Sequence, residues 1–497
     1  MTDTHLPPYP PQLSEARLAE LQGHAIDWAL AHGLIVRAPP ALVSQDAANV
    51  PVVTHAPFAL FPSPFPRRCY AQATELQPLY NTLVDTLAKD DVFIRQVMDS
   101  LSKVDDFTGK LYDIYQAVSG PNGSKQRVKL GLHRSDYLLH VPVDAPAFTE
   151  PVLQQVELNT IASSFSSLSG LASELHSYLL NRTNFFNDPS LLSPDITASA
   201  LPTNTSGTSI AKGIAKAHEL YGVKSAVAVM VVQPGERNAF DQRWIEYTLF
   251  KNHGVKLIRK SLDEIQVQAK LEGPERRLYI DGSEVAVTYF RAGYAPTDYP
   301  SDKEWQARQT IESSYSIKCP SIAYHLVGTK KVQQILALPG VVERFVKDEK
   351  HAQLLRNSFT GLYPLDGSQD GEKAVEIALE RGGEGFVMKP QREGGGNNIY
   401  GADIPPLLSK MTVQERNAYI LMDLIRPPPL KNIMVRQGAL IEGEVVSELG
   451  VYGLWVSDGD EIHLNEAGGH LLRTKASTSN EGGVAAGFAV LDSPLLV

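Results

Sequence analysis

The 497-residue chain has very few cysteines and no long apolar segment. Its two cysteines, Cys69 and Cys319, lie far apart and in no C-x-x-C arrangement, which excludes a disulfide scaffold and a cysteine-built zinc site. We expect both thiols to be buried and reduced. The longest unbroken apolar run, Ala226 to Val232, is far shorter than the roughly 18 residues that a membrane-spanning helix needs. Residues 1–11 show no basic-then-apolar signal sequence, so we expect a soluble, cytoplasmic protein.

Basic residues are also fewer than acidic residues. The chain has 46 Lys and Arg against 56 Asp and Glu, a net charge of -10. Such an excess of acidic residues disfavours sequence-independent binding to nucleic acid or to anionic membranes, which requires a cationic surface. We therefore expect no nucleic-acid and no membrane partner, and a polyanionic ligand only where cations gather locally.

Several familiar catalytic motifs are missing as well. The phosphate-binding loop G-x-x-x-x-G-K-[ST] and the dinucleotide fingerprint G-x-G-x-x-G do not occur. H-E-x-x-H and G-x-S-x-G are absent too, which disfavours zinc and serine hydrolysis. No repeat of 20–50 residues is present, so solenoids and propellers are excluded.

The apolar pattern predicts a mixed α/β and α+β fold. Helical spacing covers residues 13–32 and 76–117, and strands are expected at 128–140 and 152–159. From residue 206 helices and strands alternate, with a buried parallel strand at 225–232 and a hairpin at Asp281-Gly282. Further strands are expected at 385–389, 419–423, 445–452 and 461–465. We therefore expect residues 221–328 to form an inserted α/β domain within a discontinuous body, 1–220 and 329–497.

The most informative segment is Lys389-Pro-Gln-Arg-Glu-Gly-Gly-Gly-Asn-Asn398. Three glycines allow backbone N–H groups to approach phosphate oxygens closely. Lys389 and Arg392 add positive charge, and Glu393 can hold a magnesium ion. The alternative is an ordinary glycine-rich surface turn.

A second group of candidate ligands lies at the end of the strand expected at 152–159. Glu157 and Asn159 are two residues apart and so face the same side of a strand. Carboxylate and amide oxygens suit magnesium, although the same spacing also occurs on the polar face of an edge strand. Ser163 and Ser164 can contact a polar ligand or cap the following helix.

Isolated cations complete the set: Arg134, Arg291, Lys330, Arg473 and Lys475. Each alone is more often a surface charge. Arginine, however, is the side chain best suited to holding carboxylates by two parallel hydrogen bonds.

Five motifs occur in an order that resembles eukaryotic-type glutathione synthetase, a family of the ATP-grasp superfamily. They are residues 156–160, 236–242, 328–334, 389–400 and 482–487, and the resemblance extends from Arg134 to the C-terminus. It implies an ATP-grasp architecture with an inserted substrate-binding domain and a glycine-rich lid at 392–398. It also implies a magnesium-dependent, homodimeric ligase that joins γ-glutamylcysteine to glycine with ATP. The peptide carboxylate would first be phosphorylated, and glycine would then displace phosphate from the acyl phosphate.

The resemblance also implies roles for individual residues. The catalytic residues would be Lys330, Lys389 and Arg473, and the magnesium ligands Glu157, Asn159 and Glu393. The ATP-contacting residues would be Lys330, Lys389, Pro390, Gln391, Arg392, Glu393, Gly394, Gly395, Gly396, Asn397, Asn398, Tyr400, Met422, Asp423, Leu424, Ile425, Glu448, Lys475 and Glu481. The substrate-binding residues would be Arg134, Ile161, Ala162, Ser163, Ser164, Glu236, Arg237, Asn238, Gln242, Arg291, Ala292, Gly293, Tyr294, Arg473, Val484 and Ala485.

Two positions depart from the family pattern: Ala162 replaces a common serine, and Glu481 replaces an aspartate found in some members. Two other functions remain open as alternatives. One is a related ligase that uses β-alanine or another amine. The other is a catalytically silent nucleotide-binding regulator, which would be expected to lack a metal ligand or a phosphate-binding lysine; this chain has both.

Overall fold

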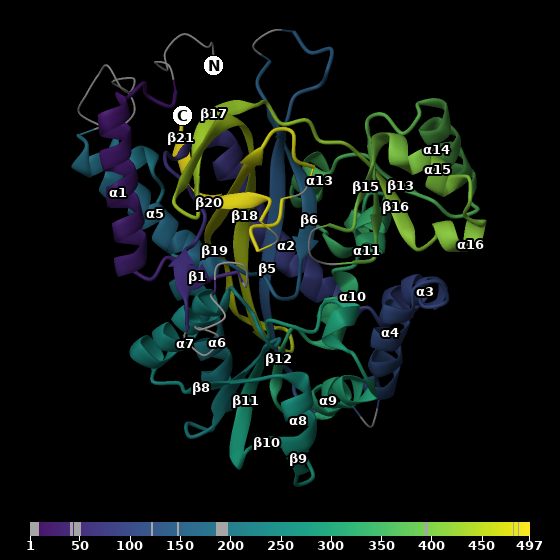
Figure 1. Ribbon diagram of the computed structural model, residues 1–497. Helices are drawn as coiled ribbons and strands as arrows, with labels where there is room; N and C mark the ends of the chain where they lie inside the picture. Colours follow the sequence, from purple (N-terminus) through teal and green to yellow (C-terminus); the bar gives the residue numbers. More distant parts are fainter. Residues whose placement is uncertain are drawn as a thin grey trace.

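A computed structural model describes residues 9–39, 43, 51–120, 123–146, 149–184, 197–392, 396–480, 482–485 and 487–497. Helices and strands are mixed throughout this part of the chain (Figure 1). The expected mixed α/β class is therefore confirmed. Both cysteines are buried free thiols, as expected. Across the described ranges, none of the helices combines the length and apolar character that crossing a membrane requires.

A seven-stranded sheet forms the centre of the molecule. Its strands, in spatial order, are β17 (Leu430–Arg436), β3 (Phe58–Ala59), β20 (Ala489–Asp492), β19 (Glu461–Ala476), β18 (Ala439–Asp458), β5 (Val128–His140) and β6 (Val152–Asn159). All neighbouring pairs are antiparallel except β20 with β3. β18 and β19 are longer than the sequence predicted, because their polar ends also pair, with β17 and with each other.

Helices cover both faces of this sheet. On one face lies α2 (Arg67–Lys89), followed by α3 (Asp91–Leu101) and α4 (Asp106–Val118), and α2 contacts β5, β18 and β19. The opposite face is covered by α5 (Ser166–Arg182) and α6 (Ser206–Tyr221), with α1 (Glu15–Ala31) against α5 (Figure 1). Leu132 and Leu454 contact α6 near Gly213 on this second face. Residues further along the same strands on this face, such as Arg134 and Asp136, line or underlie a cavity.

A second sheet, largely parallel, contains β8 (Leu257–Lys260), β7 (Val227–Val231), β11 (Ser283–Phe290), β10 (Arg277–Ile280), β9 (Ala269–Glu272) and β12 (Ile317–Cys319). β7 pairs in parallel with β8 and β11, which confirms the buried parallel strand expected there. Asp281 and Gly282 turn the chain between β10 and β11 with φ of 51° and 74°, as a tight hairpin requires. The sheet packs with α7 (Ala239–His253), α8 (Leu262–Gln268) and α9 (Asp302–Ser313).

A third, antiparallel sheet has the order β13 (Leu362–Pro364), β16 (Tyr419–Asp423), β14 (Phe386–Pro390) and β15 (Ile399–Tyr400). Helices α14 (Gln369–Glu380) and α15 (Ile404–Leu408) cover one of its faces. Its other face presents Val387 and Met422 toward Leu138 and Val156 of the central sheet. The expected strands at 385–389 and 419–423 are thus confirmed.

The remaining elements connect or flank these layers. They are β1 (Ile35–Arg37), β2 (Val53–His55), β4 (Ser63–Phe65), α10 (Ile322–Val327), α11 (Lys330–Leu336), α12 (Val342–Phe345), α13 (Glu349–Ser358), α16 (Val413–Arg416) and β21 (Pro494–Leu496).

Candidate functional site

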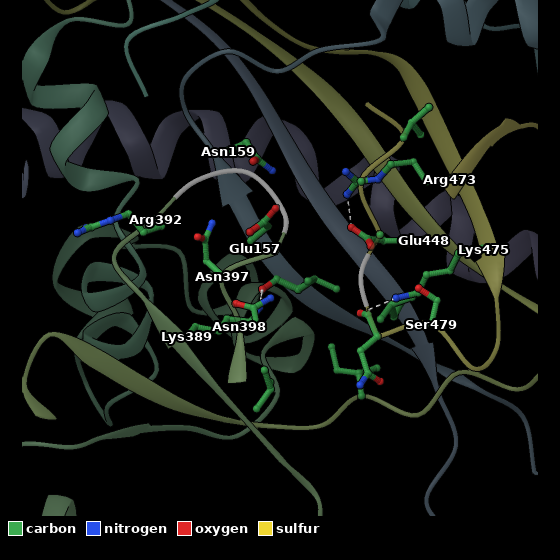
Figure 2. Close-up of a pocket in the computed structure, with 18 of the residues that line it drawn as sticks. Glu157, Asn159, Lys389, Arg392, Asn397, Asn398, Glu448, Arg473, Lys475 and Ser479 are labelled. Atoms are coloured by element: carbon green, nitrogen blue, oxygen red, sulfur yellow. Dashed lines mark hydrogen bonds and ion pairs between the residues drawn. The ribbon is translucent and has the colours of Figure 1, made fainter. Parts of the chain in front are cut away.

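A cavity of about 1020 Å³ lies between the central sheet and the third sheet. Its walls come from β5, β6, β14, β15, β16, β18 and β19, from the start of α11, and from the loops that follow β6, β11, β14, β16 and β19. Figure 2 shows acidic, amide and cationic side chains from these separate elements surrounding one hollow.

Most of the residues that the sequence singled out meet in this cavity. Those lining it are Arg134, Glu157, Asn159, Ile161, Ala162, Ser163, Ser164, Tyr294, Lys330, Lys389, Arg392, Asn397, Asn398, Tyr400, Met422, Asp423, Leu424, Ile425, Glu448, Arg473, Lys475, Val484 and Ala485. Those placed outside its lining are Glu236, Arg237, Asn238, Gln242, Arg291, Ala292, Gly293, Pro390, Gln391 and Gly396. Glu393, Gly394, Gly395 and Glu481 lie outside the described residues.

Sequence reasoning missed a further set of lining residues. They are Leu138, Val156, Phe165, Ala295, Pro296, Thr297, Val387, Pro427, Pro429, Glu444, Val446, Ser477, Ser479 and Asn480. Gly482 and Gly483, from the motif at residues 482–487, also line the cavity. Strand alternation could have identified some of the missed residues, because Leu138 follows Arg134 by four and Val446 precedes Glu448 by two. Val156 could not be found in this way. A β-bulge between β5 and β6 lets both Val156 and its neighbour Glu157 reach the cavity.

Glu157 lies beside two lysines that come from other elements. Its Oε2 is 3.0 Å from the Nζ of Lys330, at the start of α11. Lys389, on β14, donates from Nζ to the carbonyl oxygen of Val156 over 3.0 Å. Burial alone would raise the pKa of the Glu157 carboxyl, but Lys330, Lys389 and Arg473 outweigh this effect and hold that pKa below its ordinary value. Glu157 is therefore an ionised carboxylate in a cationic setting.

Asn159 lies on the same face as Glu157, as the spacing predicted, and β6 is the edge strand of the sheet. Its amide nitrogen donates to the carbonyl oxygen of Arg134 over 3.2 Å and to Oδ2 of Asp136 over 2.9 Å. The side-chain oxygen of Asn159 is consequently the atom that remains for a ligand.

Two arginines approach the cavity from the centre of the sheet. Arg134, on β5, donates to Asp136 from both Nε (2.6 Å) and Nη2 (2.8 Å). Arg473, on β19, faces Glu448 directly across the β18–β19 pair and forms an ion pair with it. Burial raises the pKa of Glu448, and so do Asp136 and Glu157, against the opposite pull of Arg473.

The glycine-rich segment is anchored at both of its described ends. Before the glycines, Arg392 forms an ion pair with Asp105, the N-cap of α4. After them, Asn398 donates to the hydroxyl of Tyr400 over 3.2 Å, and that hydroxyl donates to the carbonyl oxygen of Asn480 over 3.3 Å. Lys475 of β19 donates to the same carbonyl oxygen over 2.7 Å. The Asn480 carbonyl oxygen therefore connects strand β19 to the C-terminal end of the glycine-rich segment.

The loop of residues 161–164 is fixed by a carboxylate that the sequence did not single out. Ser163 and Ser164 do not cap α5, so that alternative for them is wrong. The N-cap is Phe165, whose side chain makes no capping hydrogen bond. Instead Asp241 of α7, fully buried, accepts the N–H groups of Phe165 and Ser167, each over 2.8 Å. Arg291 joins this contact, since it donates to Asp241 over 3.2 Å and to the Ala162 carbonyl over 2.8 Å. Arg291 therefore supports the loop from behind the cavity lining.

The motif at residues 236–242 lies outside the cavity lining in this structure. Glu236 accepts the backbone N–H of Asn238 over 2.7 Å and the amide of Gln233 over 3.0 Å. Arg237 is exposed and donates to the carbonyl oxygen of Arg37 over 3.3 Å. Their expected contact with substrate remains a prediction.

The described residues contain no group of three His, Cys, Asp or Glu side chains that could hold a metal ion. Two of the three expected metal ligands, Glu157 and Asn159, do lie together at the cavity. The third, Glu393, falls in the part of the chain that is not described.

Comparison with known proteins identifies a family. The model of "Eukaryotic glutathione synthase, ATP binding domain" matches residues 15–496. The chain is 44% identical to glutathione synthetase of Dictyostelium discoideum, over 97% of this chain and 100% of that protein. It is 41% identical to the Homo sapiens glutathione synthetase, over 96% and 97% of the two chains. The chloroplastic glutathione synthetase of Arabidopsis thaliana is 42% identical, over 98% and 87%.

Among solved structures, a glutathione synthetase-like effector from Globodera pallida superimposes with a TM-score of 0.76 over 98% of both chains. The two sequences are 22% identical, so this similarity concerns the fold alone.

Proposed function

Because the chain belongs to the eukaryotic glutathione synthase family, we propose that it joins the carboxylate of γ-glutamylcysteine to the amine of glycine. The protein is an ATP-dependent ligase. In the proposed reaction a carboxylate oxygen of the peptide attacks the γ-phosphorus of ATP, which releases ADP and leaves an acyl phosphate. The glycine amine then attacks the acyl carbon and loses a proton, and the carbon–oxygen bond breaks to release phosphate.

The observation that carries this proposal is the gathering of cations in an acidic protein. Lys330, Lys389, Arg134, Arg473 and Lys475 reach one cavity from four different elements, although the chain carries a net charge of -10. Phosphorylating a carboxylate brings two anions together, and these cations lower the electrostatic cost. Positioning and charge stabilisation then supply most of the catalysis, as in other phosphoryl transfers.

We place the nucleotide between the two sheets, as in an ATP-grasp enzyme. Val387 and Met422 of the third sheet face Leu138 and Val156 of the central sheet, and together they form an apolar slot that suits a purine ring. Lys389 lies at the end of β14 beside this slot and can reach the phosphates. A lid formed by residues 392–398 would keep water from the acyl phosphate, which otherwise hydrolyses.

The metal in this proposal is magnesium, and the described part of its site fits that ion. Glu157 is held ionised, and the Asn159 nitrogen is engaged by hydrogen bonds, which leaves two oxygens on one face of β6. Oxygen ligands of this kind suit a hard cation. With Glu393 they would hold a magnesium ion that neutralises charge on the ATP phosphates.

The peptide substrate would lie against the two arginines and the loop of residues 161–164. Arg473 and Arg134 can pair with its carboxylate, while Ser163 and Ser164 offer polar contacts. The segment 482–485, with two glycines and Ala485, leaves room for a small amine. A homodimeric assembly and a cytoplasmic location are also part of the proposal; two relatives, by contrast, are named as chloroplastic.

The test measures ADP release from ATP and γ-glutamylcysteine with glycine, with β-alanine and without an amine. We expect glycine to exceed β-alanine by at least about tenfold in kcat/KM, which corresponds to about 1.4 kcal/mol of differential transition-state binding. Equal rates with the two amines would favour the alternative ligase. Absence of peptide-dependent ADP release would favour the silent regulator.

A further inference from the structure

Asp136 is a completely buried carboxylate directly beneath the candidate site. It is not among the residues that line the cavity, but it contacts three that do. It accepts hydrogen bonds from Arg134 (2.6 and 2.8 Å), from the amide of Asn159 (2.9 Å) and from Nη2 of Arg473 (2.9 Å). These residues belong to β5, β6 and β19, so a single carboxylate links three strands.

The link to Arg473 has to cross β18, which lies between β5 and β19. The residue of β18 opposite Asp136 is Gly450. A Cβ atom at Gly450 would lie 2.7 Å from Oδ1 of Asp136 and 2.8 Å from Cδ of Arg134, which is too close for real atoms. The absence of a side chain at Gly450 therefore creates the space that this cluster occupies.

Each contact with Asp136 fixes the orientation of a side chain in the site. The bond from Asn159 uses its amide nitrogen, so the amide oxygen is left for a metal ion. The two hydrogens on Nη2 of Arg473 go to Asp136 and Glu448 and Nε is buried, which leaves Nη1 for a ligand. Asp136 likewise occupies Nε and Nη2 of Arg134, while Nη1 donates to the Ser164 carbonyl over 3.3 Å.

We propose that Asp136 is a positioning residue for ligation: it holds Arg134 and Arg473 for the peptide carboxylate and Asn159 for the metal. This inference rests on the proposed function. Charge balance at Arg473 does not require Asp136, because Glu448 already pairs with Arg473. Burying a carboxylate carries a large desolvation penalty, and here its hydrogen-bond partners are three side chains of the site itself.

The test compares Asp136→Asn with a matched control, Asp492→Asn. Asp492 is also a buried aspartate of the central sheet, but its partners are Ser63, Thr474 and Ser493, away from the cavity. For Asp136→Asn we expect the KM for γ-glutamylcysteine to rise at least about tenfold and the magnesium concentration for half-maximal activity to rise, as for other supporting contacts. Metal-free binding of ADP, which uses the apolar slot, should change less than about threefold. Asp492→Asn should change neither the peptide KM nor the magnesium dependence.

A second variant, Gly450→Ala, displaces the same cluster without removing a charge, and we expect it to raise the same two quantities. If Asp136→Asn does not fold, Gly450→Ala tests the proposed role of Asp136 in its place. The inference is overturned if these variants lower kcat only in proportion to the folded protein that is lost, while the peptide KM and the magnesium dependence stay unchanged. That result would show that Asp136 has a merely structural role. An inactive wild-type enzyme would refute the proposed function and this inference with it. An active wild type with variants that match it would refute the inference alone.

Discussion

Removing the carboxylate of Asp241 should both destabilise the protein and disturb its site. Asp241 accepts three backbone N–H groups at the start of α5, from Phe165, Ser167 and Leu168, over 2.8, 2.8 and 3.3 Å. It also forms an ion pair with Arg291, and the two side chains are 0% and 3% exposed. In Asp241→Ala, all four donors lose their acceptor in a region from which water is excluded.

The size of the effect follows from these contacts. A buried donor left without a partner costs about 1–3 kcal/mol, and removal of one partner of a buried ion pair costs about 3–5 kcal/mol. These terms overlap, because the helix end and Arg291 can both shift, so we expect a loss of about 5 kcal/mol in the free energy of unfolding. Asp241→Asn retains one acceptor oxygen and should lose about half as much. Either loss is a large fraction of the 5–15 kcal/mol typical of folded domains.

Urea unfolding followed by circular dichroism measures this loss, and steady-state kinetics measures the effect on the site. We expect the KM for γ-glutamylcysteine to rise in Asp241→Asn, since the loop of residues 161–164 loses part of its support. The control is Asp90→Ala, which removes a partly exposed N-cap of α3 that accepts the Phe93 N–H over 2.9 Å. Its cost should be only about 1 kcal/mol. If Asp241→Ala unfolds within about 1 kcal/mol of the wild type, our account of this contact is wrong.

Three further perturbations test other parts of the account. Arg473→Lys keeps the charge, but its single nitrogen cannot contact Asp136 and Glu448 and also reach the peptide carboxylate, so kcat/KM should fall by at least about tenfold. The urea midpoint of Arg473→Lys should fall less than that of Arg473→Met. If Arg473→Lys has the same kinetics as the wild type, Arg473 does not act in the site. Asp105→Asn retains the N-cap of α4 but loses the charge opposite Arg392, so the KM for ATP should rise at least about threefold with less than about 1 kcal/mol of destabilisation. An unchanged KM for ATP would show that this pair does not position the glycine segment. Burial lowers the pKa of His133 and His470 to about 3 and that of His176 to about 4. These imidazoles bind protons mainly after unfolding, because their pKa values are lower in the folded protein. The folded protein therefore loses stability as the pH falls below about 6.5, the pKa of a histidine in the unfolded chain. The loss at pH 5 is up to about 2 kcal/mol for each histidine. Urea midpoints at pH 7.5 and pH 5 measure this loss of stability. The difference between the two midpoints should be smaller in His470→Gln than in the wild type. Equal midpoints at the two pH values for the wild type would contradict the prediction.

The sequence predicted much of the fold because local signals were strong. The β-branched run before Val232 and the Asp281-Gly282 turn each specify their structure without help from distant residues. The full length of β18 and β19 could not be predicted, because their polar ends become strands only by pairing with partners elsewhere in the chain. The bulge that brings Val156 into the cavity depends in the same way on the register between β5 and β6.

The site was predictable where polar residues interrupt apolar strands, as at Glu157 and Asn159. Residues that act from behind the cavity were not. Asp136, Asp241 and Gly450 could not be identified, since apart from the pair of Asp136 with Arg134 their contacts come from strands and helices tens to hundreds of residues away. Only the folded arrangement shows that one carboxylate joins three strands, or that a helix end is capped by a different helix.

The most direct test of the central claim follows an oxygen atom through the reaction. γ-Glutamylcysteine labelled with ¹⁸O in its cysteinyl carboxylate is incubated with ATP, magnesium, glycine and the protein, and the phosphate is analysed by mass spectrometry. Because the labelled oxygen attacks phosphorus and later leaves with it, we predict one ¹⁸O atom in each phosphate released during peptide formation. Unlabelled phosphate formed alongside the tripeptide would contradict the acyl-phosphate route.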